Sequence, residues 1–62
     1  MSPDEAARIV SPAELHVLLL ASTGVGRRTG SLMLGISEDA RRWRLSSARR
    51  KIAQHTREQE AA

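Results

Sequence analysis

The residues best suited to chemistry lie between Arg41 and Lys51, where positive charge is concentrated. These eleven residues include five Arg, one Lys, no acidic residue and Trp43, which is the only aromatic residue of the chain. Guanidinium groups bind phosphates and guanine through paired hydrogen bonds, and they keep their charge at any physiological pH. The composition of this segment therefore predicts an anionic binding partner.

The distribution of charge along the chain supports this prediction. Residues 1–26 carry a formal charge of −2, residues 27–51 carry +6 and residues 52–62 carry −1, within a net charge of +3. A localised positive field of this kind steers a protein towards phosphates. The alternative at this point is a basic helix face that is merely solvated.

Other kinds of chemistry find little support in the sequence. There is no Cys, and His16 and His55 have no nucleophile or orienting carboxylate spaced to join them, so neither a metal site nor an enzyme is expected. The Gly-rich segment 24–31 lacks the lysine and spacing of a phosphate-binding loop. We therefore expect no cofactor and no small-molecule substrate.

A membrane is also not the expected partner. The longest apolar run, residues 17–21, is far shorter than the ~20 residues that span a bilayer, and no basic and apolar leader follows Met1. A basic helix lying on a membrane surface would need a wider apolar face. The sequence favours a soluble, cytoplasmic protein.

Capping residues predict where the helices that carry these charges begin and end. Ser2 and Ser11 are each followed by Pro and, three residues after the Ser, by Glu, which is the pattern of a helix N-terminus. Gly35 is suited to ending a helix and Ser37 to capping the next. The predicted elements are helices at about 3–9, 12–22, 27–34 and 38–54 and a frayed tail at 55–62, with a last turn over 57–61 capped by Thr56 as the alternative.

No segment alternates in the manner of a strand, so the fold class is all-α: one domain over residues 1–62, built as a small bundle of three or four helices. Residues 12–22 are apolar on nearly all sides, and we expect Ile9 and Val10 to pack across this helix. Met33 is assigned to the core. At 100° per residue, one side of the basic helix consists of Arg41, Leu45, Ala48 and Ile52.

Four fragments in order resemble the LuxR-type (GerE-like) helix-turn-helix domain without a gap. They are Val10-Ser11-Pro12-x-Glu14-x-x-Val17-Leu18-x-Leu20, then Gly24-Val25, then Leu34-Gly35-Ile36-Ser37-Glu38 with Lys51-Ile52. Residues 45–52 are also similar to the end of region four of bacterial sigma factors. The resemblance covers residues 10 to about 52, and it implies a scaffold helix, a second helix docked on it and a recognition helix laid in the DNA major groove.

The chain departs from the family pattern at two positions that face each other in the family fold. Gly30 stands where the family has an apolar residue, and Arg41 stands where it has a valine. We hypothesise that the missing side chain at Gly30 gives the Arg41 stem room along the core. Ala53 and a polar tail replace the glycine and the dimer-forming fourth helix of the family.

The expected function is that of a sequence-specific transcription regulator in a bacterium, its phage or a plasmid, with double-stranded DNA as partner. Trp43 is ambiguous, because a lone Trp serves in a core, in a subunit interface or on DNA. The candidate base-contacting residues are Asp39, Arg42, Trp43, Ser46 and Arg50. The candidate phosphate-contacting residues are Arg27, Arg28, Ser37, Arg44, Ser47, Arg49 and Lys51.

One recognition helix covers only one half-site, so a homodimer, a tandem array along DNA or a partner protein is expected. The rival interpretation is a protein-interaction module derived from a helix-turn-helix. Such a module would bind RNA polymerase, a sigma factor or another regulator through Trp43 and the leucine-rich helix, with little DNA binding.

Overall fold

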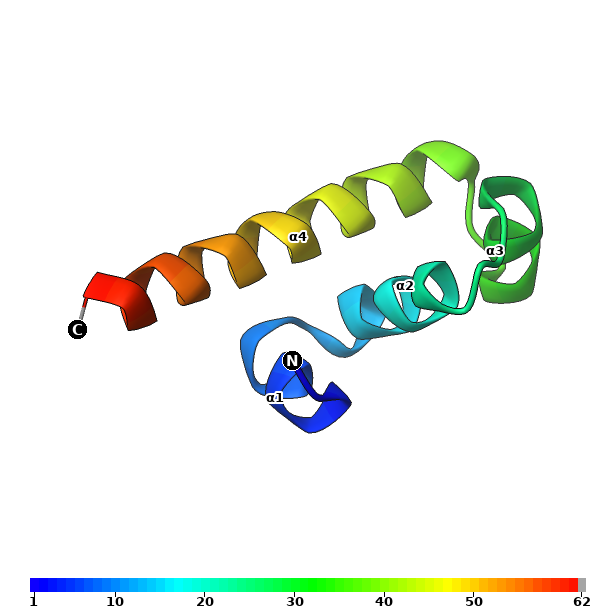
Figure 1. The fold of residues 1–62 in the computed structure, drawn as a ribbon. Coiled ribbons are helices and arrows are strands. Elements are labelled where there is room, and N and C mark those ends of the chain that lie inside the picture. The colour runs from blue at the N-terminus through cyan, green and yellow to red at the C-terminus, as the bar shows by residue number, and fades with distance from the viewer. Residues whose placement is uncertain (62) are drawn as a thin grey trace.

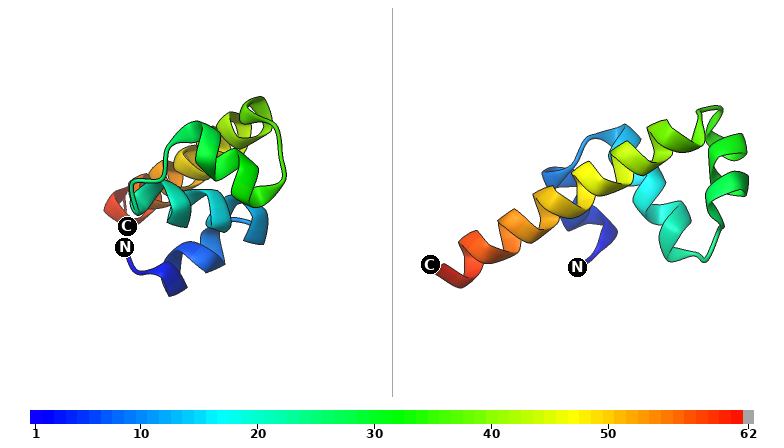
Figure 2. Two further views of the ribbon diagram at one scale, coloured as in Figure 1. Left: turned by 90° about the vertical axis from the view of Figure 1, so that its right-hand side faces the viewer. Right: turned by 90° about the horizontal axis from the view of Figure 1, so that it is seen from above.

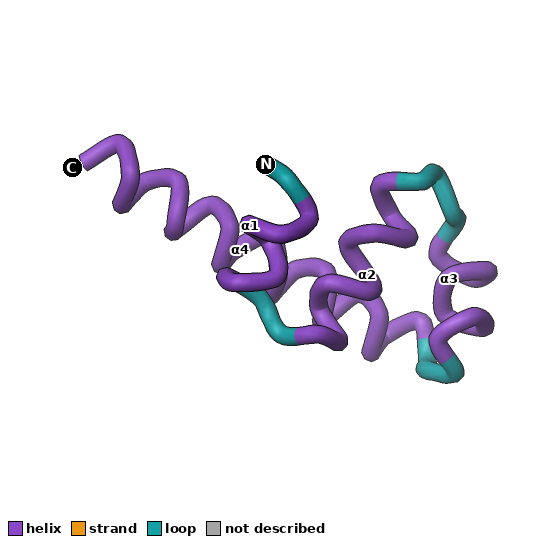
Figure 3. The backbone as a smooth tube through the Cα atoms, turned by 90° about the horizontal axis from the view of Figure 1, so that it is seen from below, coloured by secondary structure: helices purple, strands orange, loops and turns teal. Residues whose placement is uncertain are grey.

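The computed structural model describes residues 1–61, which form four helices and no strand. The helices are α1 (Pro3–Ile9), α2 (Pro12–Ser22), α3 (Arg27–Leu34) and α4 (Glu38–Ala61). In Figure 1, α4 crosses the molecule as one long helix, with α2 beneath it and α3 at one end. The fold is therefore all-α, as the sequence predicts, and short loops join the helices (Figure 3).

The helix ends have the expected local chemistry. The Ser11 hydroxyl accepts a hydrogen bond from the Glu14 amide at 3.2 Å, and the Glu14 carboxylate accepts one from the Ser11 amide at 2.7 Å, which completes a capping box. Gly35 ends α3 in the left-handed conformation with φ of 67°. The Ser37 hydroxyl then accepts from the Ala40 amide and caps α4. The bounds of α1, α2 and α3 coincide with the predicted ranges.

The predicted end of the basic helix at residue 54 and the frayed tail at 55–62 are wrong over the residues described. Helix α4 is continuous from Glu38 to Ala61, and residue 62 lies outside the described part of the chain. No Gly or Pro interrupts this stretch, and Gln54 and Glu58 are joined by a side-chain hydrogen bond one turn apart. Thr56 is thus an interior helical residue, and the end of α4 extends past the other helices (Figure 2).

The core lies where α1 and α2 meet the middle of α4, and it is small. Its buried apolar side chains are Ala6, Val10, Val17, Leu45 and Ala48. Helix α1 contacts both α2 and α4, and Val10 is buried there. The half-buried Ile9 lines a hollow with His55 and Gln59 of α4, so its packing across α2 stays a prediction. Met33, in contrast, is 62% exposed, so its assignment to the core is wrong. The buried or half-buried residues of the end of α3 are Gly30, Ser31 and Leu34, and Met33 lies on another side of the helix.

Gly30 and Arg41 are in contact, as the hypothesis from the sequence requires. A Cβ atom on Gly30 would lie 3.1 Å from Nε and 3.8 Å from Cδ of Arg41. Arg41 is only 8% exposed, yet no nitrogen of its side chain is both buried and unpaired. The stem of Arg41 therefore lies along the core beside Gly30, and its guanidinium group reaches solvent.

This contact predicts a thermodynamic coupling between positions 30 and 41. Gly30→Ile alone should destabilise the protein by about 1–3 kcal/mol, because the new side chain overlaps the Arg41 stem. In an Arg41→Val background the same substitution should cost clearly less, because the stem is gone. A double-mutant cycle by urea denaturation measures the coupling. Strictly additive effects, or a stabilising Gly30→Ile, would disprove it.

Candidate nucleic-acid interface

Helix α4 has a buried side and an exposed side, and the predicted division between them is confirmed in its first half. Arg41, Leu45 and Ala48 are buried, and Ala48 is 0% exposed. Ile52 continues the same side and is half-buried. Because these residues recur every three or four positions, they lock the rotation of α4 about its axis. The opposite side is therefore presented to solvent in one fixed orientation.

The five candidate base-contacting residues are all exposed on that opposite side. They are Asp39, Arg42, Trp43, Ser46 and Arg50. Trp43 is 71% exposed, so the interpretation of Trp43 as a core residue is wrong. Its place opposite Ala48 on the helix explains this exposure, and it leaves contact with DNA or with another protein as the two remaining roles.

Some of the candidate DNA-contacting cations form ion pairs with nearby carboxylates. Arg27 Nε lies 3.1 Å from Glu38 Oε1, a contact that joins the first turn of α3 to the first turn of α4. Arg42 Nη2 lies 3.5 Å from Oδ1 of Asp39, which is one turn away on the surface of α4. Exposed pairs of this kind contribute little stability, so a phosphate or a base can replace the carboxylate.

Lys51 has a different role from the phosphate contact predicted for it. Its Nζ atom lies 2.8 Å from Oε1 of Glu14, whose side chain is only 8% exposed. The Lys51 ammonium is the main cause that lowers the pKa of Glu14 from 4.5 to about 2, and the Ser47 hydroxyl and the Ser11 amide lower it further. Burial acts against this shift, since it favours the neutral acid. Lys51 thus fixes α4 to the beginning of α2.

Sequence reasoning missed this pair. The capping pattern indicated that Glu14 turns back to Ser11, but nothing local connects Glu14 with a lysine 37 positions later. Both residues belong to the fragments that resemble the LuxR-type domain, and that shared membership was the only available signal.

Between residues 27 and 51, five arginines have no acidic partner within 4.0 Å in residues 1–61. One is the buried Arg41, and the others are Arg28, Arg44, Arg49 and Arg50. Arg44 and Arg50 lie beside Trp43 along a groove between α4 and the beginning of α2. Ser47 is half-buried in the same groove, and Ser37 is exposed at the turn before α4. The structure thus brings an indole ring and two free guanidinium groups together.

The side chains on this surface are suited to binding an anionic partner. In the part of the chain that the structure describes, no three His, Asp or Glu side chains form a group able to hold a metal ion. None of the helices of residues 1–61 has the length and apolarity needed to cross a membrane. An exposed side of α4 with free guanidinium groups and an indole is suited to phosphates and to the edges of bases.

Comparison with protein-family models, with curated proteins and with solved structures gave no match. The function of the exposed side of α4 is therefore argued from its own residues and geometry.

Proposed function

We propose that the protein is a sequence-specific DNA-binding regulator of transcription that lays α4 in the major groove of double-stranded DNA. The observation that carries this proposal is the exposed side of α4, on which Arg42, Trp43 and Arg50 are held by a buried opposite side. The major groove admits an α-helix, and long side-chain donors in a fixed orientation suit direct readout of its base edges.

The arrangement of α3 and α4 supports the proposal. The two helices are joined by the three residues 35–37, which is typical of a helix-turn-helix unit. Helix α2 packs behind α4, and the contact between Arg27 and Glu38 ties the beginnings of α3 and α4 together. Recognition helices contact base edges mainly with residues of their first turns, which here include Asp39, Arg42, Trp43 and Ser46.

The charges suggest how the remaining cations divide between roles. Arg42 and Arg50 are the residues that we assign to base edges, and a bidentate arginine contributes about 1–3 kcal/mol of discrimination for guanine. Arg28, Arg44 and Arg49, without acidic partners, suit backbone phosphates. Lys51 is left out of this set, because Glu14 holds its ammonium group.

Selection of bound sequences from a random DNA pool with the purified protein tests the proposal. We expect enrichment of one short motif, a few base pairs long and containing guanine opposite Arg42 or Arg50. A pool that remains random after repeated rounds would contradict sequence-specific binding. The random pool consists of DNA duplexes, because the proposed binding site of α4 is the major groove of B-form DNA.

The affinity for the selected duplex should depend steeply on salt. Each phosphate that a cation neutralises contributes about −0.9 to the slope of log K against log [salt]. The three arginines assigned to phosphates, Arg28, Arg44 and Arg49, therefore give a slope of about −3. Fluorescence anisotropy of a labelled duplex at a series of salt concentrations measures the slope. A value near zero would show that phosphates are not contacted.

The second candidate function is a protein-interaction module that binds the transcription machinery or another regulator. The observation that favours it is the exposure of Trp43 together with Leu32 and Met33 on α3. Under this alternative, substitution of Trp43 abolishes capture of the protein partner, and substitution of Arg42 and Arg50 leaves that capture intact.

A further inference from the structure

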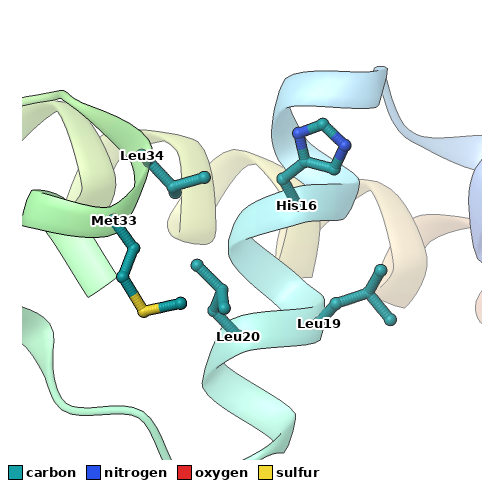
Figure 4. Close-up of a pocket in the computed structure, with 5 residues that line it drawn as sticks. All are labelled: His16, Leu19, Leu20, Met33 and Leu34. Atoms are coloured by element: carbon teal, nitrogen blue, oxygen red, sulfur yellow. The ribbon is translucent and has the colours of Figure 1, made fainter. Parts of the chain in front are cut away.

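Two surfaces of the molecule differ in the contacts that they can make with base edges. The hollow between α2 and α3 (Figure 4) is lined by His16, Leu19, Leu20, Met33 and Leu34, none of which is an Arg, Lys, Asp or Glu. The exposed side of α4 carries arginines and, in the first turn of the helix, a carboxylate. Discrimination between bases by charged groups therefore belongs to the exposed side of α4 and not to the hollow.

The carboxylate on the exposed side of α4 is that of Asp39. Glu38 and Asp39 are the two acidic residues between positions 27 and 51. Glu38 is paired with Arg27 of α3 at 3.1 Å, whereas the side chain of Asp39 is 83% exposed and has Arg42 of α4 as its ion-pair partner, at 3.5 Å. A carboxylate among arginines that approach DNA repels the phosphates, and this repulsion weakens binding unless the carboxylate accepts a hydrogen bond from a base.

The beginning of α4 does not depend on the side chain of Asp39. The Ser37 hydroxyl accepts the hydrogen bond from the Ala40 amide, at 3.0 Å, that caps this helix. The charge of Asp39 suits the positive end of the helix dipole, but Glu38 supplies an equal charge in the same turn. The Asp39 carboxylate is thus available to a base.

We propose that Asp39 selects a cytosine next to the guanine that Arg42 binds, an inference that rests on the proposed function. When Arg42 turns to guanine, the Asp39 carboxylate loses its cation. An ionised carboxylate only accepts hydrogen bonds, and the amino groups of cytosine and adenine are the donors of the major groove. Adenine presents the acceptor N7 beside its amino group, so the carboxylate pairs with N4 of cytosine.

The spacing of the two residues places the cytosine on the neighbouring base pair. Asp39 and Arg42 are three positions apart, which is a rise of about 4.5 Å along an α-helix. Successive base pairs are about 3.4 Å apart. Exposed side chains adjust to the difference of about 1 Å, because neighbouring atoms do not hold them in place. Asp39 and Arg42 together therefore read two adjacent base pairs.

Parallel selections from the random pool of duplexes with wild type and with Asp39→Asn test this inference. Wild type should enrich a motif in which a cytosine lies next to a guanine. Asp39→Asn should keep the guanine and prefer adenine at the neighbouring position, because asparagine pairs with N6 and N7 of adenine. In anisotropy titrations, exchange of that cytosine for adenine should weaken binding of wild type about tenfold and strengthen binding of the variant.

Glu38→Gln is the matched control, since it removes the same charge from the same turn of α4. Both side chains are exposed, so both variants should keep the circular dichroism spectrum of wild type. Glu38→Gln should enrich the wild-type motif with its cytosine. A shift to adenine in this control as well would overturn the inference, because the preference would then follow the charge of the first turn.

The selections separate failure of this inference from failure of the proposed function. A wild-type pool that stays random contradicts the proposed function, and the role of Asp39 with it. A wild-type motif without a cytosine beside the guanine, or one that Asp39→Asn leaves unchanged, overturns the role of Asp39 alone. Loss of the guanine in Asp39→Asn also overturns it, because Asp39 would then act by positioning Arg42.

Discussion

Replacement of Glu14 by glutamine is expected to destabilise the protein by about 2 kcal/mol at neutral pH and to remove most of its sensitivity to acid. The glutamine loses a charge-assisted hydrogen bond with Lys51 and weakens the cap of α2. Lys51 is 44% exposed, so solvent screens part of the attraction. The loss is still large for a domain with so small a core.

The dependence on pH follows from the direction of the shift. The pKa of Glu14 is lowered from 4.5 to about 2, so the folded state favours the carboxylate. Its contribution to stability is complete above pH 4.5 and disappears as the pH falls towards 2. Urea denaturation between pH 2 and pH 7 should therefore show wild type and Glu14→Gln converging at the acid end.

Glu5→Gln is the control for this comparison. Glu5 occupies the same position after Ser2 as Glu14 does after Ser11, but it is exposed and has no counterpart of Lys51 in residues 1–61. We expect its substitution to change stability by no more than a few tenths of a kcal/mol. If the free energies of unfolding of wild type and Glu14→Gln change in parallel with pH, the pair with Lys51 does not couple α2 to α4.

The helix ends and the buried side of α4 were accessible from the sequence because both depend on neighbouring residues. A serine cap, a proline after it and a glycine in the left-handed conformation act within one turn, and the bounds of α1, α2 and α3 follow from them. The burial of Leu45 and Ala48 follows from helical spacing alone. Even the contact between Gly30 and Arg41 was predictable, because the family pattern places the two positions opposite each other.

Features that depend on distant residues could not be predicted. The pair of Glu14 and Lys51 joins two helices 37 positions apart and removes Lys51 from the phosphate candidates. Exposure of Met33 depends on which side of α3 faces the other helices, and this is a property of tertiary packing. The length of α4 exceeds the predicted 38–54 because residues 55–61, although polar, contain no Gly or Pro that would end a helix.

The sequence predicts which residues of the candidate site are exposed. It does not predict which of them form ion pairs. All five proposed base-contacting residues lie on the exposed side of α4. The structure adds that Arg42 is paired with Asp39, whereas Arg50 is free and lies in a groove with Trp43. To bind DNA, Arg42 would therefore have to leave Asp39, whereas Arg50 would not have to break an ion pair.

The central claim is that the exposed side of α4 between Asp39 and Arg50 reads DNA, and the affinity of one double variant for the selected duplex tests it most directly. Arg42→Ala with Arg50→Ala should weaken binding at least about 100-fold, since two potential bidentate contacts are lost. Arg8→Ala with Arg57→Ala removes the same charge from α1 and from the last turns of α4. We expect this control to bind within about threefold of wild type. Equal losses in the two variants would contradict the account, because binding would then follow net charge and not the exposed side of α4.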